Sequence, residues 1–138
     1  MGLWIALGVS PMAEDFEMVA EAMLMAYAES VNTADADGLA ELFWLEDERC
    51  SGVADTGAEP LGRVAFRALL SESLISGEPG EHMVWHQARA HRLSSEAGYV
   101  TAMQHRGNAW QRVTLILLKK GHEWGILHMH ASPAATST

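Results

Sequence analysis

The chain has 138 residues, the length of one domain, and 49% of them are hydrophobic, enough to bury roughly two thirds of the unfolded surface in a single core. The formal net charge is -9, and the 9 lysines and arginines do not cluster, which argues against a nucleic-acid or an anionic membrane surface as partner. We therefore expect a neutral small molecule or another protein chain as partner.

Cysteine usage and the N-terminus bear on the compartment. Cys50 is the single cysteine, so no internal disulfide and no Cys-based zinc site can form, which suits a reducing compartment. The apolar run at residues 3–9 has no preceding Lys or Arg and is too short to span a bilayer. We expect residues 1–11 to be an N-terminal extension, and the protein to be soluble, cytoplasmic and independent of membranes.

Three helices are predicted in the first half of the chain. Ser10 and Pro11 would cap a helix over residues 11–31, and residues 32–35 end that helix and cap a second, shorter one. A third helix begins at Gly62 and stops at residues 76–80. The apolar stripe of the first helix consists of Phe16, Ala20, Met23, Tyr27 and Val31.

Strands fill the second half. After acidic residues 46–48, expected to be a solvated loop, comes a short strand at 49–54. Further strands are predicted at 82–93, 98–106, 113–118 and 124–131, the last two joined as a hairpin, and residues 134–138 form a flexible tail. This order predicts the α+β class, with helices gathered on one face of a curved antiparallel sheet that leaves a conical pocket.

The hairpin indicates how the sheet is covered. Val113, Leu115 and Leu117 point one way and their apolar neighbours the other, so neither face of this strand suits water. Helices would cover one face and a second subunit the other. In the next strand the alternation places His128 and His130 on the same face as Trp124.

Several segments resemble one known family. The segment A-Y-A-E-S-V-N-T-A-D-A-D-G-L-A-E-L-F at 26–43, the helix start at Gly62, R-V-T-L-I-L-L at 112–118 and W-G-I-L-H-M-H-A-S at 124–132 resemble the SnoaL-like branch of the nuclear transport factor 2-like superfamily. This superfamily includes ketosteroid isomerases, polyketide cyclases and limonene epoxide hydrolase. The resemblance covers residues 12–133 and implies a single domain there, folded as a cone-shaped α+β barrel with three N-terminal helices and usually dimeric through its sheet.

The resemblance to the isomerases carries over in part. Tyr27 matches the tyrosine that donates a hydrogen bond to the developing enolate. The general-base aspartate falls near Ser51 or Gly52, and the second aspartate near Thr114, so neither carboxyl group is present. Asp55 or a histidine would have to replace the base.

His128 and His130 are the candidate acid or base, because histidine titrates near neutral pH. The alternative is that both are structural, at the sheet edge or the subunit contact. Their H-x-H spacing lacks a third ligand, and no Gly-rich phosphate loop is present, so we expect neither a metal nor another cofactor.

Two functions remain open at this point. The first is a non-catalytic homodimeric binding or association module, whose pocket captures a small apolar or polycyclic ligand or a partner's peptide. The second is an isomerase, polyketide cyclase or epoxide hydrolase that uses Tyr27 as donor and His128 or His130 as acid or base. In either case the predicted ligand-binding residues are Met23, Trp85, Met103, Gln104, Trp110 and Thr114.

Overall fold

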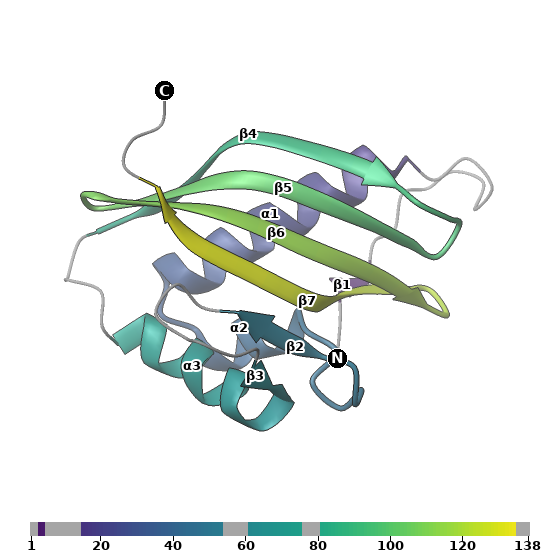
Figure 1. Cartoon of the computed structure of the whole chain (residues 1–138), viewed down its shortest axis with the longest axis horizontal. Coiled ribbons are helices and arrows are strands. Elements are labelled where there is room, and N and C mark those ends of the chain that lie inside the picture. Colours follow the sequence, from purple (N-terminus) through teal and green to yellow (C-terminus); the bar gives the residue numbers. More distant parts are fainter. Residues whose placement is uncertain (1–2, 5–14, 54–60, 76–80, 135–138) are drawn as a thin grey trace.

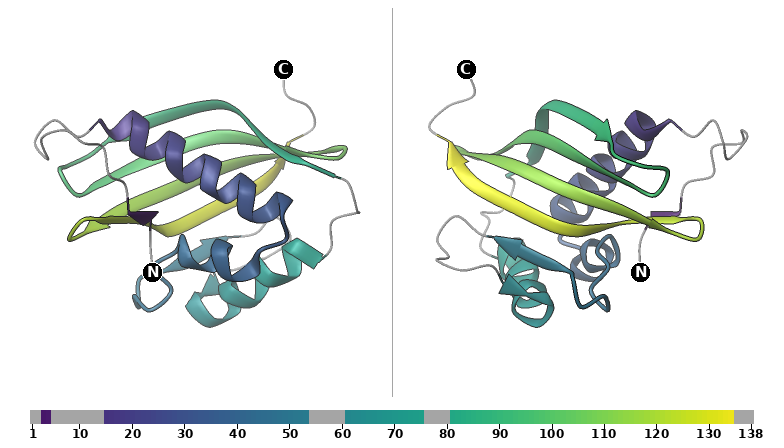
Figure 2. Two further views of the ribbon diagram at one scale, coloured as in Figure 1. Left: turned by 180° about the vertical axis from the view of Figure 1, so that it is seen from behind. Right: turned by 45° about the vertical axis from the view of Figure 1, so that its right-hand side comes forward.

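Helices pack on one face of a curved sheet in this protein, as the α+β prediction requires (Figures 1 and 2). The computed structural model describes residues 3–4, 15–53, 61–75 and 81–134. Among these residues no helix is both long enough and apolar enough to cross a membrane. The elements are β1 (Leu3–Trp4), α1 (Phe16–Asn32), α2 (Ala36–Glu41), β2 (Ser51–Val53), β3 (Leu61–Gly62), α3 (Arg63–Ile75), β4 (Met83–Arg92), β5 (Ala97–Arg106), β6 (Ala109–Lys120) and β7 (Glu123–Ala134).

The strands form one sheet in the order β3-β2-β7-β6-β5-β4. All neighbouring pairs are antiparallel except β2 and β7, which are parallel. Part of the predicted N-terminal extension joins this sheet, because β1 pairs antiparallel with β7 at Glu123 and Trp124. The predicted hairpin is confirmed, and its strands are longer than the apolar runs that revealed it.

Helix α1 begins later than the sequence suggested. Asp15 is its N-cap and accepts a hydrogen bond from the backbone N–H of Glu17, so the predicted start at Pro11 is wrong. The predicted apolar stripe is confirmed, since its five residues from Phe16 to Val31 are all buried. Figure 2 shows α1 lying diagonally across the concave face of the sheet.

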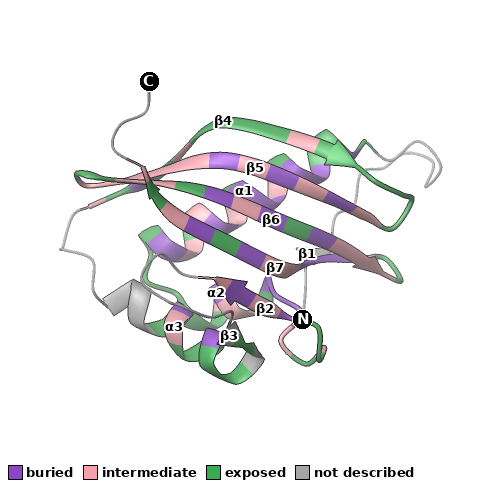
Figure 3. Ribbon diagram, viewed as in Figure 1, coloured by how far each residue is buried: buried purple, intermediate pink, exposed green. Residues whose placement is uncertain are grey.

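The core lies between α1 and the inner face of β5, β6 and β7. In β6 the alternation is confirmed: Val113, Leu115 and Leu117 are buried, whereas Ile116 points to the outer face and is 37% exposed. Burial along the ribbons alternates in the same way in Figure 3. No described helix covers the outer face of the sheet (Figure 1).

A bulge in β7 overturns one prediction about side-chain direction. Leu117 pairs with Ile126 and Ile116 pairs with His128, so Leu127 is an extra residue in the ladder. Because a one-residue insertion exchanges the two faces, Trp124 and Ile126 point inward whereas His128 and His130 point outward. The expectation that both histidines share a face with Trp124 is therefore wrong.

The acidic segment at residues 46–48 is not simply solvated. The Asp47 side chain, 10% exposed, accepts hydrogen bonds from Arg49 and from Lys120 at the end of β6, both at 2.8 Å. These cations hold the pKa of the Asp47 carboxyl well below its ordinary value. The ammonium of Lys120 also lies 4.6 Å from the ring centre of Trp44, so the loop is anchored to the hairpin.

Gly52 should be intolerant of a side chain. A Cβ at Gly52 would lie 2.3 Å from the Phe66 ring, which is itself buried against Phe43, whereas a Cβ at Gly62 in the paired strand β3 would meet nothing within 4 Å. We predict that Gly52→Ala lowers the free energy of unfolding by about 1 to 3 kcal/mol through overpacking, measured by urea denaturation. Gly62→Ala is the matched control, and equal losses in the two variants would contradict the packing described here.

Candidate functional site

A small, partly open cavity lies on the inner face of the sheet near the C-terminal half of α1. Its volume is about 190 Å³, somewhat more than the roughly 150 Å³ of an engineered cavity that binds benzene. Residues from α1, β2, α3 and strands β4 to β7 line it: Tyr27, Val31, Val53, Phe66, Leu69, Leu70, Met83, Gln104, Arg106, Gln111, Met129 and Ala131.

Tyr27 is the only buried tyrosine among the described residues, and packing holds its ring rigidly. The ring makes edge contacts with Trp85 and Phe43, at centroid distances of 5.4 and 6.3 Å. Its hydroxyl donates to the thioether sulfur of Met129 at 3.6 Å. Thioether sulfur is a weak acceptor, so a ligand oxygen could replace it at little cost.

The Tyr27 hydroxyl stays protonated over the whole physiological range. Burial raises the pKa of Tyr27 from 10.0 to about 12, and the Gln104 side chain and the charge of Arg106 oppose this rise only in part. Tyr27 therefore offers a neutral O–H donor to the cavity at neutral pH.

Three further polar side chains reach the same cavity. Gln104 and Arg106 are two residues apart on β5 and so share its inner face, and Gln111 is the cross-strand partner of Gln104 on β6. Gln104 was predicted from the sequence, but Arg106 and Gln111 were missed. The period-two alternation that begins at Gln104 was the signal that could have found Arg106.

The other predicted ligand-binding residues lie elsewhere. Met23 is fully buried in the core, and the indole N–H of Trp85 donates to the Leu24 carbonyl at 2.9 Å, outside the lining of the cavity. The strand register turns three of the predicted residues to the outer face, so the prediction that they line the cavity is wrong for Met103, Trp110 and Thr114. Alternation along a strand predicts two sets of residues but does not indicate which set faces α1.

The predicted catalytic residues do not converge on Tyr27. His128 lies on the outer face with its Nδ1 2.8 Å from the Ser51 hydroxyl, and His130 is exposed. Burial, and secondarily the charge of His130, lower the pKa of His128. Asp55 lies outside the described residues, so its predicted role remains a prediction.

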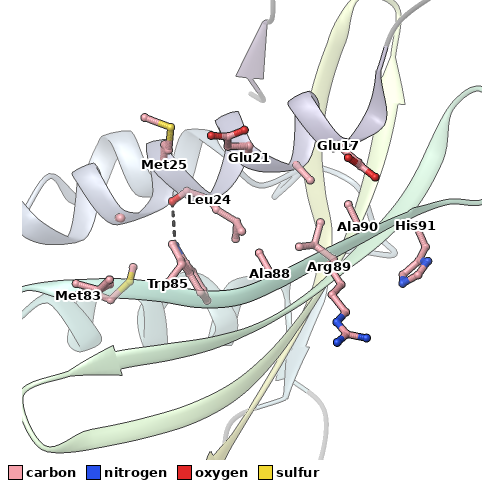
Figure 4. A pocket seen from close by; sticks show the side chains of 14 residues that line it. Glu17, Glu21, Leu24, Met25, Met83, Trp85, Ala88, Arg89, Ala90 and His91 are labelled. Carbon is pink, nitrogen blue, oxygen red and sulfur yellow. Dashed lines mark hydrogen bonds between the residues drawn. The ribbon is translucent and has the colours of Figure 1, made fainter. Parts of the chain in front are cut away.

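A second hollow, the groove between α1 and β4, is larger but less like a site. It is open, with a volume of about 800 Å³. Figure 4 shows Leu24 and Trp85 within it, whereas Glu21 points away from β4 and Arg89 and His91 extend to the far side of that strand. Since its polar side chains diverge, the groove lacks the convergent groups that orient a ligand.

No metal centre is evident within residues 15–53, 61–75 and 81–134. In that part of the chain no three His, Cys, Asp or Glu side chains gather as they would around a metal ion.

The fold and the cavity define a class of protein. It is a cone-shaped α+β domain in which a curved sheet packs around a long helix, with a small, largely apolar cavity between them. The SnoaL-like domain family matches residues 20–136, and the chain belongs to that family. No functionally curated protein is similar enough in sequence to count as a relative.

Solved structures agree on the fold. An uncharacterised protein with a cystatin-like fold from Caulobacter vibrioides superimposes with a TM-score of 0.73 at 17% identity, covering 88% of this chain and 91% of that one. An NTF2-like protein of unknown function from Pseudomonas putida KT2440 gives 0.72 at 14% identity, with 84% of each chain covered. A proposed scytalone dehydratase from Novosphingobium aromaticivorans gives 0.68 at 17% identity, covering 86% of this chain and 84% of that one. At these identities the likeness establishes the fold alone.

The raised pKa of Tyr27 predicts a specific loss of stability in alkali. Between pH 10 and 12 a tyrosine in the unfolded chain ionises while buried Tyr27 stays protonated, so the unfolded state is favoured as pH rises. We expect the free energy of unfolding to fall over this range by roughly 2 kcal/mol more in the wild type than in Tyr27→Phe, measured by denaturation at a series of pH values. Parallel curves for the two proteins would contradict the buried, protonated state of Tyr27.

Proposed function

We propose that this protein binds a small molecule with an apolar body and one polar end inside the cavity of the cone. One observation carries the proposal: Tyr27, Gln104, Arg106 and Gln111 all reach a hollow whose other lining residues are apolar. Few polar groups on an apolar wall are typical of small-molecule sites, because the apolar surface supplies affinity and the polar groups fix orientation. Rigid packing of Tyr27 between two aromatic rings supports the same conclusion, since a preorganised donor loses little freedom on binding.

Binding is better supported than acid–base catalysis. An isomerase, polyketide cyclase or epoxide hydrolase needs a proton acceptor beside the donor. The described residues that line the cavity include no carboxylate and no histidine, and His128 and His130 lie on the opposite face of the sheet. Tyr27 thus has the position of a catalytic hydrogen-bond donor, but no described residue lies beside it as a base. Enzymatic activity remains the alternative function, to be tested by a turnover assay once a ligand is identified.

The cavity volume limits the size of the ligand. About 190 Å³ suits one ring with a small substituent, by comparison with the roughly 150 Å³ cavity that holds benzene.

A panel of monocyclic aromatic compounds tests the proposed site. A ligand at about 100 times its dissociation constant should stabilise the protein by roughly 2.7 kcal/mol and raise the unfolding midpoint by several degrees. Ala131→Leu should abolish this shift because the larger side chain fills the cavity, whereas Thr114→Val, a change on the outer face of the neighbouring strand, should keep it. A ligand that stabilises the Ala131→Leu variant as strongly as the wild type would place the binding site elsewhere.

Two further proposals concern the setting of the protein. The outer face of the sheet exposes apolar side chains, among them Ile116 at 37% and Val84 at 45%, and this supports a homodimer formed through that face. A cytoplasmic location is supported by the single cysteine, Cys50, which has no second cysteine in the chain with which to form a disulfide.

Ile116 tests the dimer because it lies near the middle of the outer face, opposite His128. We expect the wild type to sediment as a dimer at micromolar concentration and Ile116→Asp to sediment as a monomer, since an unpaired carboxylate in an apolar contact is costly. A wild type that sediments as a monomer at that concentration would refute the proposed dimer.

A further inference from the structure

The polar groups of the cavity are mainly hydrogen-bond donors. Arg106 carries up to five N–H donors and no acceptor, and Tyr27, protonated throughout the neutral range, offers one O–H. Gln104 and Gln111 each add an amide NH₂ group beside a carbonyl oxygen. A ligand group that only accepts, and accepts several hydrogen bonds at once, fits this set best.

The charge of the cavity wall has one sign. Arg106 is the only charged residue among the described lining residues, in a chain whose net charge is -9. Its charge acts on the Tyr27 hydroxyl by favouring the ionised form, so Arg106 creates a positive potential where the hydroxyl lies. Arg106 has other interactions within the fold, and its planar guanidinium can keep them while another edge meets a ligand.

The position of Arg106 indicates how a ligand would be oriented. Arg106 lies at the end of β5 beside the β5–β6 turn, whereas Met129 pairs with Leu115 farther along β6 and Phe66 lies over Gly52 of β2. The acidic end of a ligand would therefore point to the turn end of β5 and β6, and its apolar body would lie against Phe66, Leu70 and Met129.

We infer that the ligand is a monocarboxylate of about the size of benzoate, whose carboxylate is held by Arg106 with help from Gln104, Gln111 and Tyr27. This inference rests on the proposed ligand-binding function and specifies its ligand class. A carboxylate offers two oxygens in a plane, which matches the fork of a guanidinium and the amide donors of the two glutamines. A phosphate ester would bring more charge than one arginine balances.

Benzoate and its neutral isostere benzamide have almost the same shape. Comparing them separates a preference for the carboxylate from binding of any small aromatic molecule. We expect isothermal titration calorimetry to show that the wild type binds benzoate roughly 10- to 100-fold more tightly than benzamide, since hydrogen bonds to charged groups are the stronger ones. Arg106→Met should erase this preference, and Arg106→Lys should retain part of it because the charge remains but the fork is lost.

Arg112→Met is the matched control. Arg112 is exposed on the outer face of β6, so this variant changes the net charge by the same amount as Arg106→Met without touching the cavity. It should keep the full preference for benzoate. Circular dichroism and the unfolding midpoint show whether each variant is folded. If Arg106→Met does not fold, Arg106→Lys is the test, and an undiminished preference for benzoate in that variant would refute the inference.

The outcomes separate the inference from the function on which it rests. If the wild type binds benzoate and benzamide with equal affinity, the inference that the ligand is a carboxylate is refuted. The proposal that the cavity binds a small molecule would still stand. Preference for benzoate that persists in a folded Arg106→Met or disappears in Arg112→Met would also refute the inference that the ligand is a carboxylate. Binding of neither compound, nor of any neutral monocyclic probe, would overturn both.

Discussion

The packing of α1 against the concave face of the sheet is the contact on which the remaining structure depends. One stripe of the helix, from Phe16 to Val31, supplies much of the buried surface, and the inner residues of β5, β6 and β7 supply the rest. At its N-terminal half the helix packs tightly against β5 and β7, with the Phe16 ring 5.4 Å from Trp124 and over Gly98. Toward its C-terminal half the packing opens, and the hollow beside Tyr27 remains.

That geometry explains why the polar residues of the cavity lie mainly at one end while most of its lining is apolar. Small and aliphatic residues such as Val31 and Ala131 leave space without hydrogen-bonding groups, so apart from Tyr27 the lining is apolar except where β5 ends and β6 begins. There Gln104, Arg106 and Gln111 reach the cavity while only half-buried, and the cost of burying their polar groups is lower. In the proposed ligand site, α1 and α3 supply much of the apolar wall, whereas the adjoining ends of β5 and β6 supply most of the polar groups.

Sequence reasoning predicted the class of fold, the stripe of α1, the hairpin and Tyr27 because each rests on periodicity or on a local segment. It failed where a single residue shifts the period. Leu127 adds one residue to β7, and this moved His128 and His130 to the outer face although the sequence alternates without interruption. It also failed where two faces are about equally apolar: nothing local distinguishes Thr114 from Val113 as the inward residue, and only the long-range register with β5 and β7 decides. Arg106 was missed because a charged residue near a strand end is ordinarily read as solvated.

The most direct test of the central claim, that a ligand binds inside the cone, is methyl NMR of the protein labelled at its methionines. Met129 lines the cavity but not the groove between α1 and β4, Met25 lines that groove but not the cavity, and Met103 lies on the outer face. Titration with a small aromatic probe should shift the Met129 methyl resonance and give nuclear Overhauser contacts to it, while Met25 and Met103 stay unchanged. Contacts to Met25 or Met103 with an unperturbed Met129 would contradict the account.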